Sequence, residues 1–78
     1  MNFVYTSNNG WKIGEQEDLF SSSVSYTIYR YYPLPDGWQP YKFMGSSLLD
    51  CFNWLWNGNF ISHDEATHHY KLLTNKKD

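Results

Sequence analysis

Cysteine is almost missing from this chain, which has only Cys51. A single cysteine cannot form an internal disulfide, so we expect a reducing compartment, with the cytoplasm as the default. Long hydrophobic runs are missing too. No apolar stretch approaches the roughly 20 residues that cross a bilayer, so no membrane association is expected. The first residues carry neither the basic segment nor the apolar core of a secretory signal.

Positive charge is also scarce. The chain has six Lys and Arg against eight Asp and Glu, a formal net charge of -2. A generic nucleic-acid binder is usually basic, so direct nucleic-acid binding is not expected. Seven of the acids, but only two of the bases, lie between Gly14 and Tyr70. Two interpretations remain open: an ordinary solvated surface, or an acidic face that contacts a basic partner.

Aromatic residues, by contrast, are abundant. Four Trp, seven Tyr and five Phe make up 21% of a chain of 78 residues. We expect one domain over residues 1–78, and a domain of this size has a small interior. Such an interior cannot cover all of these rings. Some of them are therefore expected on the surface, where exposed aromatic area usually marks an interface.

The first part of the chain, residues 1–44, predicts two antiparallel hairpins. Phe3–Thr6 and Trp11–Ile13 read as strands, and Ser7–Gly10 between them is rich in residues that tolerate a positive φ. A four-residue turn would place Val4 opposite Ile13. The following segment, 14–18, is too polar to pack and is expected to be a loop.

The second hairpin combines the strands Val24–Tyr32 and Trp38–Met44. Pro33–Gly37 between them has the proline, aspartate and glycine of a tight turn. Pro40 lacks an N–H and predicts an edge strand or a bulge. Arg30 interrupts the apolar side of its strand, so it should lie near an edge or cover the core with its aliphatic stem.

Residues 45–74 predict the helical part, and residues 75–78 a frayed tail. Ser46 or Ser47 would cap a helix ending near Asn57, with Gly58 as its left-handed C-terminal residue. Ser62 and Glu65 form a capping box for a second helix to about Thr74. A final strand over the end of that segment is the alternative. The order predicts an α+β fold: a small antiparallel sheet of about four strands, covered on one face by one or two C-terminal helices.

No catalytic or metal-binding motif is recognisable. His63, His68 and His69 lie near Asp64 and Glu65, but their spacing is not that of a zinc protease, and acid–histidine pairs are ordinary on a helix surface. A solvated helix end is therefore the preferred interpretation over a metal site, and no cofactor is expected.

Cys51 lies on the apolar side of the first predicted helix. A buried cysteine usually has a raised pKa and is inert. The five glycines are scattered, so no phosphate-binding loop is formed. We therefore expect a protein that is not an enzyme.

The candidate partner-binding residues are those that the predicted core leaves out. Trp54 lies beside the polar arc of its helix, with packing under the second helix or against the first hairpin as the open alternative. The tyrosines at 29 and 31 alternate away from the apolar side of their strand. The full predicted set is Tyr29, Tyr31, Trp38, Tyr41 and Trp54, with the acids Asp36 and Asp50.

In size, composition and strand-then-helix order, the chain resembles the compact proteins that bacteriophages and mobile elements encode, including anti-CRISPR inhibitors of host defence. The resemblance implies an inhibitor in the host cytoplasm that occludes a site on a larger, basic, nucleic-acid-handling protein, with Glu17, Asp36 or Asp50 as acidic contacts. It assigns no further residue roles. A homodimeric accessory or regulatory protein is the first alternative, and a weak binder of single-stranded nucleic acid is the second.

Overall fold

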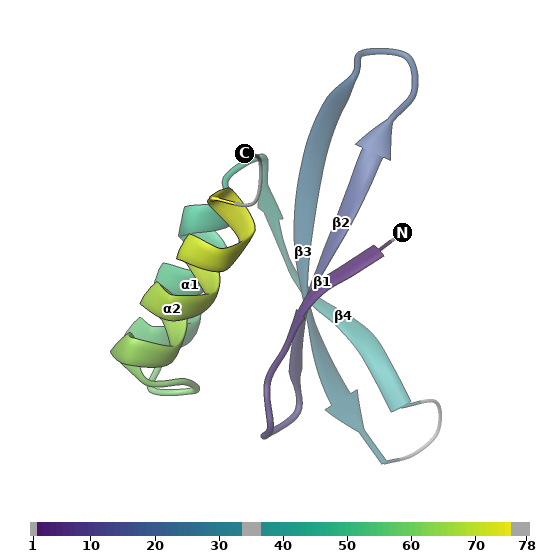
Figure 1. Ribbon diagram of the computed structural model, residues 1–78. Helices are drawn as coiled ribbons and strands as arrows, with labels where there is room; N and C mark the ends of the chain where they lie inside the picture. The colour runs from purple at the N-terminus through teal and green to yellow at the C-terminus, as the bar shows by residue number, and fades with distance from the viewer. Residues whose placement is uncertain (1, 34–36, 76–78) are drawn as a thin grey trace.

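The computed structural model describes residues 2–33 and 37–75. Within them the chain forms a four-stranded antiparallel sheet of order β1-β2-β3-β4, followed by two helices (Figure 1). The elements are β1 (Asn2–Thr6), β2 (Trp11–Asp18), β3 (Ser23–Tyr32), β4 (Gly37–Gly45), α1 (Leu48–Asn57) and α2 (His63–Thr74). Both helices lie on the same side of the sheet. The predicted α+β fold is confirmed, and the alternative of a final strand is wrong.

The segment expected to be a loop, 14–18, is instead the second half of β2. It pairs with β3 down to the last rung, Asp18 with Ser23. β1 pairs no further than Glu15, and β4 no further than Tyr26, so the end of this hairpin is a two-stranded ribbon. We call residues 16–25 the hairpin arm. Its polar side chains are compatible with a strand because the ladder satisfies the backbone while the side chains remain in water.

The register predicted for the first hairpin is wrong by one residue next to the turn, where Tyr5, not Val4, lies opposite Ile13. A bulge between Phe3 and Tyr5 restores the predicted register at Phe3, which lies opposite Gly14. The shift turns the Tyr5 ring toward the helices, where it is buried, and leaves Val4 packed at the edge of the core. The turn itself is held by Ser7, whose Oγ accepts a hydrogen bond from the Trp11 amide at 2.9 Å.

Pro40 lies in β4, which is an edge strand, and a bulge adjoins it, as predicted. The partners of Ile28 and Tyr29 are Lys42 and Pro40, so Tyr41 is the extra residue. In the preceding turn Gly37 adopts a φ of +77°, which fits its predicted role. The rest of that turn, residues 34–36 with Asp36, lies outside the described residues.

The helix starts follow the sequence closely. Ser47 Oγ accepts from the Asp50 amide at 3.1 Å, and Ser62 Oγ accepts from the Glu65 amide at 3.0 Å. The end of α1 differs from the prediction, because the left-handed residue is Asn59 (φ +64°) and Gly58 has an ordinary φ of -84°. The Phe60 amide donates to the Leu55 carbonyl at 2.9 Å, which completes a Schellman motif.

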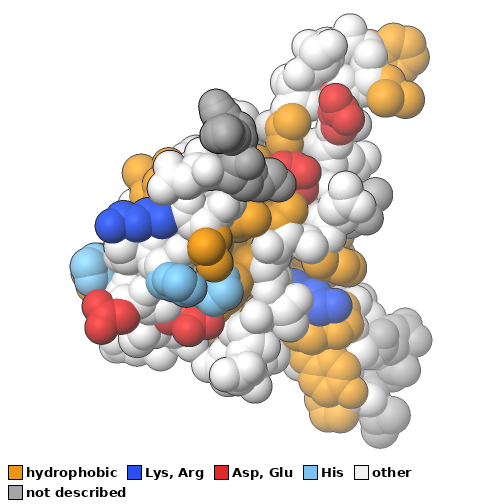
Figure 2. Space-filling view, in the orientation of Figure 1, with side chains coloured by type: hydrophobic (Ala, Val, Ile, Leu, Met, Phe, Trp, Pro, Cys, Tyr) orange, Lys and Arg blue, Asp and Glu red, His pale blue; other side chains and the backbone are white. Residues whose placement is uncertain are grey.

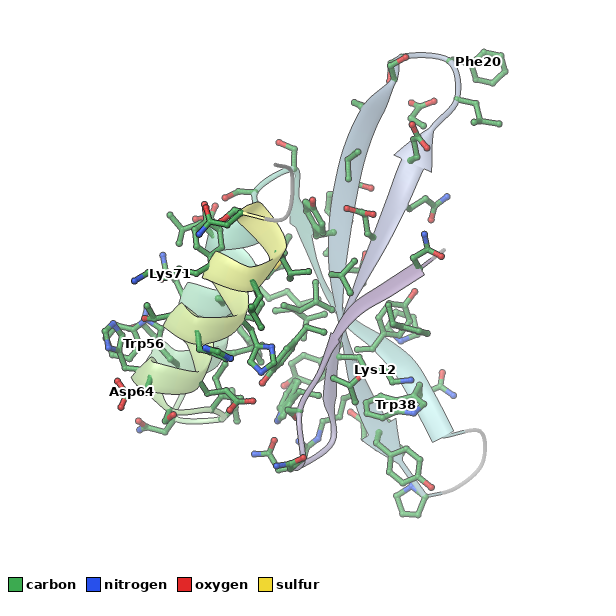
Figure 3. All side chains as sticks on the ribbon, in the orientation of Figure 1. Lys12, Phe20, Trp38, Trp56, Asp64 and Lys71 are labelled. Atoms are coloured by element: carbon green, nitrogen blue, oxygen red, sulfur yellow. The ribbon has the colours of Figure 1, made fainter. Side chains whose placement is uncertain are left out.

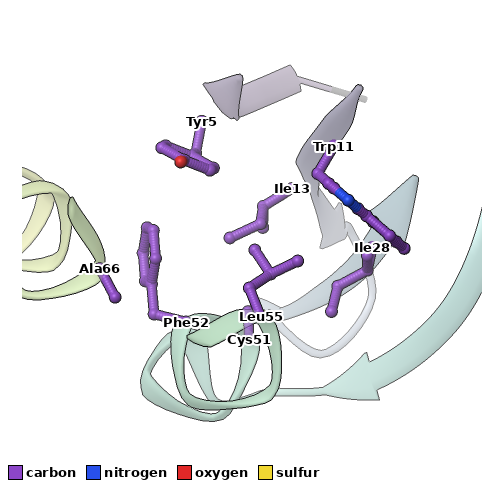
Figure 4. Packing of buried hydrophobic residues seen from close by; sticks show 8 residues of the cluster. All are labelled: Tyr5, Trp11, Ile13, Ile28, Cys51, Phe52, Leu55 and Ala66. Atoms are coloured by element: carbon purple, nitrogen blue, oxygen red, sulfur yellow. The ribbon is translucent and has the colours of Figure 1, made fainter. Parts of the chain in front are cut away.

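The core lies between the helices and the sheet (Figure 4). It consists of Tyr5, Trp11, Ile13, Ile28, Cys51, Phe52, Leu55 and Ala66. The Arg30 guanidinium lies 4.5 Å from the centroid of the Trp11 ring, so this arginine does cover the core. Among the aromatic residues, only Tyr5, Trp11 and Phe52 belong to this buried set. The interior is therefore too small for the rings that the chain carries.

Candidate interaction surface on the helix-free face of the sheet

The alternation of side chains along β3 divides its residues between two faces. Ile28 is wholly buried beneath the helices. Its neighbours Thr27 and Tyr29, and Tyr31 beyond, therefore point to the opposite side of the sheet. In Figure 3 the labelled side chains Lys12 and Trp38 lie on that side, away from both helices.

Strand pairing extends this second face over the whole sheet. Phe3 is opposite Gly14, Thr27 is opposite Phe43, and Tyr31 is opposite Trp38. Directly opposed residues of an antiparallel pair project to the same side. Rings therefore come together from strands that are distant in sequence: Phe3 and Tyr29 at 5.1 Å between centroids, and Tyr31 and Trp38 at 5.3 Å.

We call this surface the aromatic face. Its residues are Phe3, Lys12, Tyr29, Tyr31, Trp38, Pro40 and Phe43. Several of the rings are open to solvent, with exposed fractions of 68% for Phe43, 47% for Tyr31 and 44% for Phe3. Figure 2 shows hydrophobic side chains gathered on this side of the molecule around a basic one. The predicted surplus of surface rings is confirmed.

Lys12 is the one charged residue that we assign to this face. Its Nζ lies 4.3 Å from the centroid of the Phe3 ring and 4.5 Å from that of Trp38, so it makes two cation–π contacts. Among the described residues no carboxylate lies within ion-pair distance of it. The nearby acid Glu15 lies on the other face, where its Oε2 accepts a hydrogen bond from the Tyr26 hydroxyl at 3.1 Å.

The predicted binding residues do not form one patch. Tyr29, Tyr31 and Trp38 share the aromatic face, but Tyr41 and Trp54 lie on the helix side of the sheet, in contact with Trp11. Asp50 is exposed in the first turn of α1, in the helical layer. Asp36 lies outside the described residues.

Trp54 follows the second of the two alternatives and packs against the first hairpin. Its ring lies 5.6 Å from Trp11, 5.8 Å from Tyr41 and 5.3 Å from Phe60. These rings form an aromatic cluster beside the core. The Trp11 Nε1 is buried there and has no hydrogen-bond acceptor among the described residues. Trp54 is therefore partly a packing residue.

Four members of the aromatic face were not among the predicted binding residues: Phe3, Lys12, Pro40 and Phe43. The sequence does contain a signal for Phe43. A bulge next to Pro40 adds one residue to β4, so the alternation shifts and Phe43 falls on the same face as Trp38 and Pro40. Lys12 and Phe3 required the pairing of β1, β2 and β3. No local pattern connects those positions.

Cys51 and Glu65, which were considered above for catalysis or metal binding, take part in packing and hydrogen bonding. Burial raises the pKa of the Cys51 thiol to about 12, as expected for an inert cysteine. The carboxylate of Glu65 accepts from the buried Tyr5 hydroxyl at 2.8 Å and lies 3.5 Å from His69 Nε2. Burial, followed by this hydrogen bond, raises the pKa of Tyr5. Among the described residues, no three His, Cys, Asp or Glu side chains converge in a way that could hold a metal ion.

Comparisons with protein-family models, with curated protein sequences and with solved structures each gave no match. Within the described ranges, neither α1 nor α2 has the length and apolar character needed to cross a membrane.

Proposed function

We propose that this protein is a small protein-binding module without catalytic activity, and that the aromatic face is its docking surface. The observation that supports the proposal most is the gathering of rings from β1, β3 and β4 on one face of the sheet, with Lys12 of β2 in contact with two of them. In an antiparallel sheet with one covered face, the other face usually alternates to polar residues. Here it carries Phe, Tyr and Trp, which are enriched where proteins bind proteins.

The charge distribution supports the same proposal. A lysine held between two rings presents one positive group in an otherwise uncharged surface. Interfaces commonly combine such an apolar centre with a few charges that set the orientation of the partner. In the inhibitor hypothesis drawn from the sequence, the partner is a basic nucleic-acid-handling protein. The exposed acid Glu17 of the hairpin arm would then contact it beside the aromatic face, whereas Asp50 lies in the helical layer on the other side of the sheet.

A capture experiment with matched variants tests the proposal. The protein is immobilised and exposed to an extract of its source cell, and the retained proteins are identified by mass spectrometry. Replacing Tyr31 and Phe43 by serine should abolish specific retention, because both are among the most exposed rings of the proposed surface. The matched control replaces Leu49 and Leu72 by serine, since these are also exposed but lie on the helices. Equal retention by both double variants would contradict the proposal.

Single-stranded nucleic acid is a second candidate, favoured by the contact of Lys12 with exposed rings on a sheet surface. Bases stack on such rings, and a lysine can contact a phosphate. One cation predicts weak binding, with a slope of only about -0.7 in a plot of log affinity against log salt. Fluorescence anisotropy with an oligothymidine at several salt concentrations measures this slope. A loss of binding in Lys12→Gln would support this candidate, and no binding at low salt would exclude it.

A further inference from the structure

The end of the hairpin arm is the most exposed apolar feature of the described residues. Leu19 is 87% exposed and Phe20 is fully exposed, at 101%. The hairpin carries them beyond the sheet on the side away from the helices (Figure 3). Two large side chains at the end of a ribbon are costly to leave in water, and they need an apolar surface to bury them.

Two hydrogen bonds to Asp18 close the loop that presents them. Asp18 Oδ1 accepts from the Phe20 amide at 2.9 Å, and the Ser22 amide donates to the Asp18 carbonyl at 2.8 Å. Ser22 adopts a φ of +58°, which closes the four-residue loop. A loop ordered before binding loses less conformational entropy when it docks.

The charges of the arm and of the aromatic face are complementary. The arm carries Glu17 and Asp18 and has no basic residue. The aromatic face carries Lys12, which has no carboxylate within ion-pair distance among the described residues. The hydrogen bond from the Phe20 amide lowers the pKa of Asp18, so this carboxylate stays ionised at neutral pH.

The placement of these groups fits a reciprocal arrangement. Lys12 and Asp18 are six residues apart on β2, so the period of two puts both on the helix-free side, about 20 Å from each other. A two-fold axis that passes above the midpoint between them, parallel to the sheet and perpendicular to β2, brings the arm of each copy onto the aromatic face of the other. The hairpin arm projects on the side away from the helices, which lets two facing copies engage (Figure 1).

We propose that the aromatic face binds the hairpin arm of a second copy of this chain, with Asp18 next to Lys12 and Phe20 among the exposed rings, in a two-fold symmetric dimer. The proposal rests on the proposed function, because it assigns an occupant to the same surface. The occupant proposed is a second copy of the chain. Binding of a different protein to this surface is the result that the experiments below would reveal if the protein is monomeric.

The first measurement is the molecular mass in solution, by analytical ultracentrifugation at protein concentrations from about 1 to 200 µM. This range covers roughly the dissociation constants of weak to moderate dimers. Wild-type protein should be dimeric at the upper end. Phe20→Ser should weaken dimerisation at least tenfold. The control Leu72→Ser, an exposed leucine on α2, should leave it unchanged. Circular dichroism confirms that each variant is folded.

A charge cycle then tests the pairing. Lys12→Glu should weaken dimerisation at least tenfold, because it places two acids together. Asp18→Asn keeps the oxygen that accepts from the Phe20 amide but removes the charge. Added to Lys12→Glu, it should recover part of the lost affinity, whereas in wild type it should weaken the dimer. Additive effects would overturn the pairing.

Cross-linking locates the contact. Thr6 is opposite Lys12, and Ser21 is in the loop of the arm. A mixture of Thr6→Cys and Ser21→Cys proteins should form a mixed disulfide on oxidation, while Ser21→Cys mixed with Lys71→Cys should not. Native Cys51 is buried and does not interfere. A monomer at 200 µM, or a dimer that Phe20→Ser does not weaken, overturns this inference. In either case, loss of cellular capture in the Tyr31 and Phe43 double variant would still support the proposed function.

Discussion

At the residue scale, two buried ionisable groups make the stability of the fold depend on pH. The thiol of Cys51 and the hydroxyl of Tyr5 both lie in the core, and burial raises the pKa of each above its ordinary value. The folded protein therefore keeps protons that the unfolded chain releases at lower pH. A raised pKa stabilises the fold below the unfolded value, and this contribution is lost as pH rises toward the folded value.

We expect the free energy of unfolding to fall as pH rises above 9, the ordinary pKa of the thiol, toward the folded pKa of about 12. Each group contributes about 1.4 kcal/mol per pH unit while it is ionised only in the unfolded chain. Tyr5 joins above pH 10. Urea unfolding at pH 8, 9.5 and 10.5 measures the decline. Cys51→Ala should flatten it between pH 9 and 10, and an unchanged slope in that variant would contradict the assignment.

At the scale of elements, β1 and α2 are joined by one part-buried hydrogen bond between residues that are 60 positions apart. The Tyr5 hydroxyl donates to Glu65 at 2.8 Å, while the Tyr5 ring packs against Phe52 and His69. The sequence predicted Glu65 as half of a capping box. Its amide fulfils that role, but its carboxylate serves the tertiary contact.

Replacing Tyr5 by Phe should lower the free energy of unfolding by about 1–3 kcal/mol, because the ring stays packed while a hydrogen bond to a charged group is lost. The matched control is Tyr26→Phe, whose hydroxyl bonds to Glu15 at 3.1 Å in a half-buried position. It should cost less. Chemical denaturation of both variants makes the comparison, and equal losses would show that burial does not distinguish the two bonds.

The end of α1 offers a second prediction at this scale. A Cβ on Gly58 would lie 2.5 Å from the Phe60 ring, which itself packs 4.5 Å from Trp11. Gly58→Ala should therefore displace Phe60 and destabilise the fold by about 1–3 kcal/mol. Asn59→Gly should be neutral or stabilising, because glycine suits the left-handed conformation at that position. Thermal unfolding of the pair checks the contrast, and the reverse order would refute it.

At the scale of the whole molecule, the protein consists of a packed sheet-and-helix body and an arm that no helix covers. Rings on the aromatic face are exposed, but they belong to strands whose backbone is paired. Phe20 is both exposed and in a loop. Accessibility to a protease requires an unpaired backbone as well as a suitable side chain.

Brief digestion with chymotrypsin at low protein concentration should therefore cut first next to Leu19 or Phe20. Mass spectrometry of the first fragments identifies the site. Phe20→Ser serves as the control and should slow the initial cleavage. A first cut within β3 or β4 would mean that the strands open more readily than the arm.

Local patterns determined much of this fold. The serine caps, the edge strand marked by Pro40 and the alternation of β3 each depend on only a few neighbouring residues. The elements and their order could therefore be predicted from the sequence. The polar half of β2 could not be predicted in this way, because its composition is that of a loop. Its pairing with β3 decides its conformation.

The amino-acid composition already requires that rings remain on the surface, because sixteen aromatic residues exceed what a small interior can hold. Which rings those are depends on the packing of the strands and helices. A bulge in β1 and two register shifts in the pairing of β4 with β3 set the face to which each side chain turns, and the pairing of four strands brought Phe3, Lys12 and Trp38 together. Register depends on contacts between distant segments, and no local spacing specifies it.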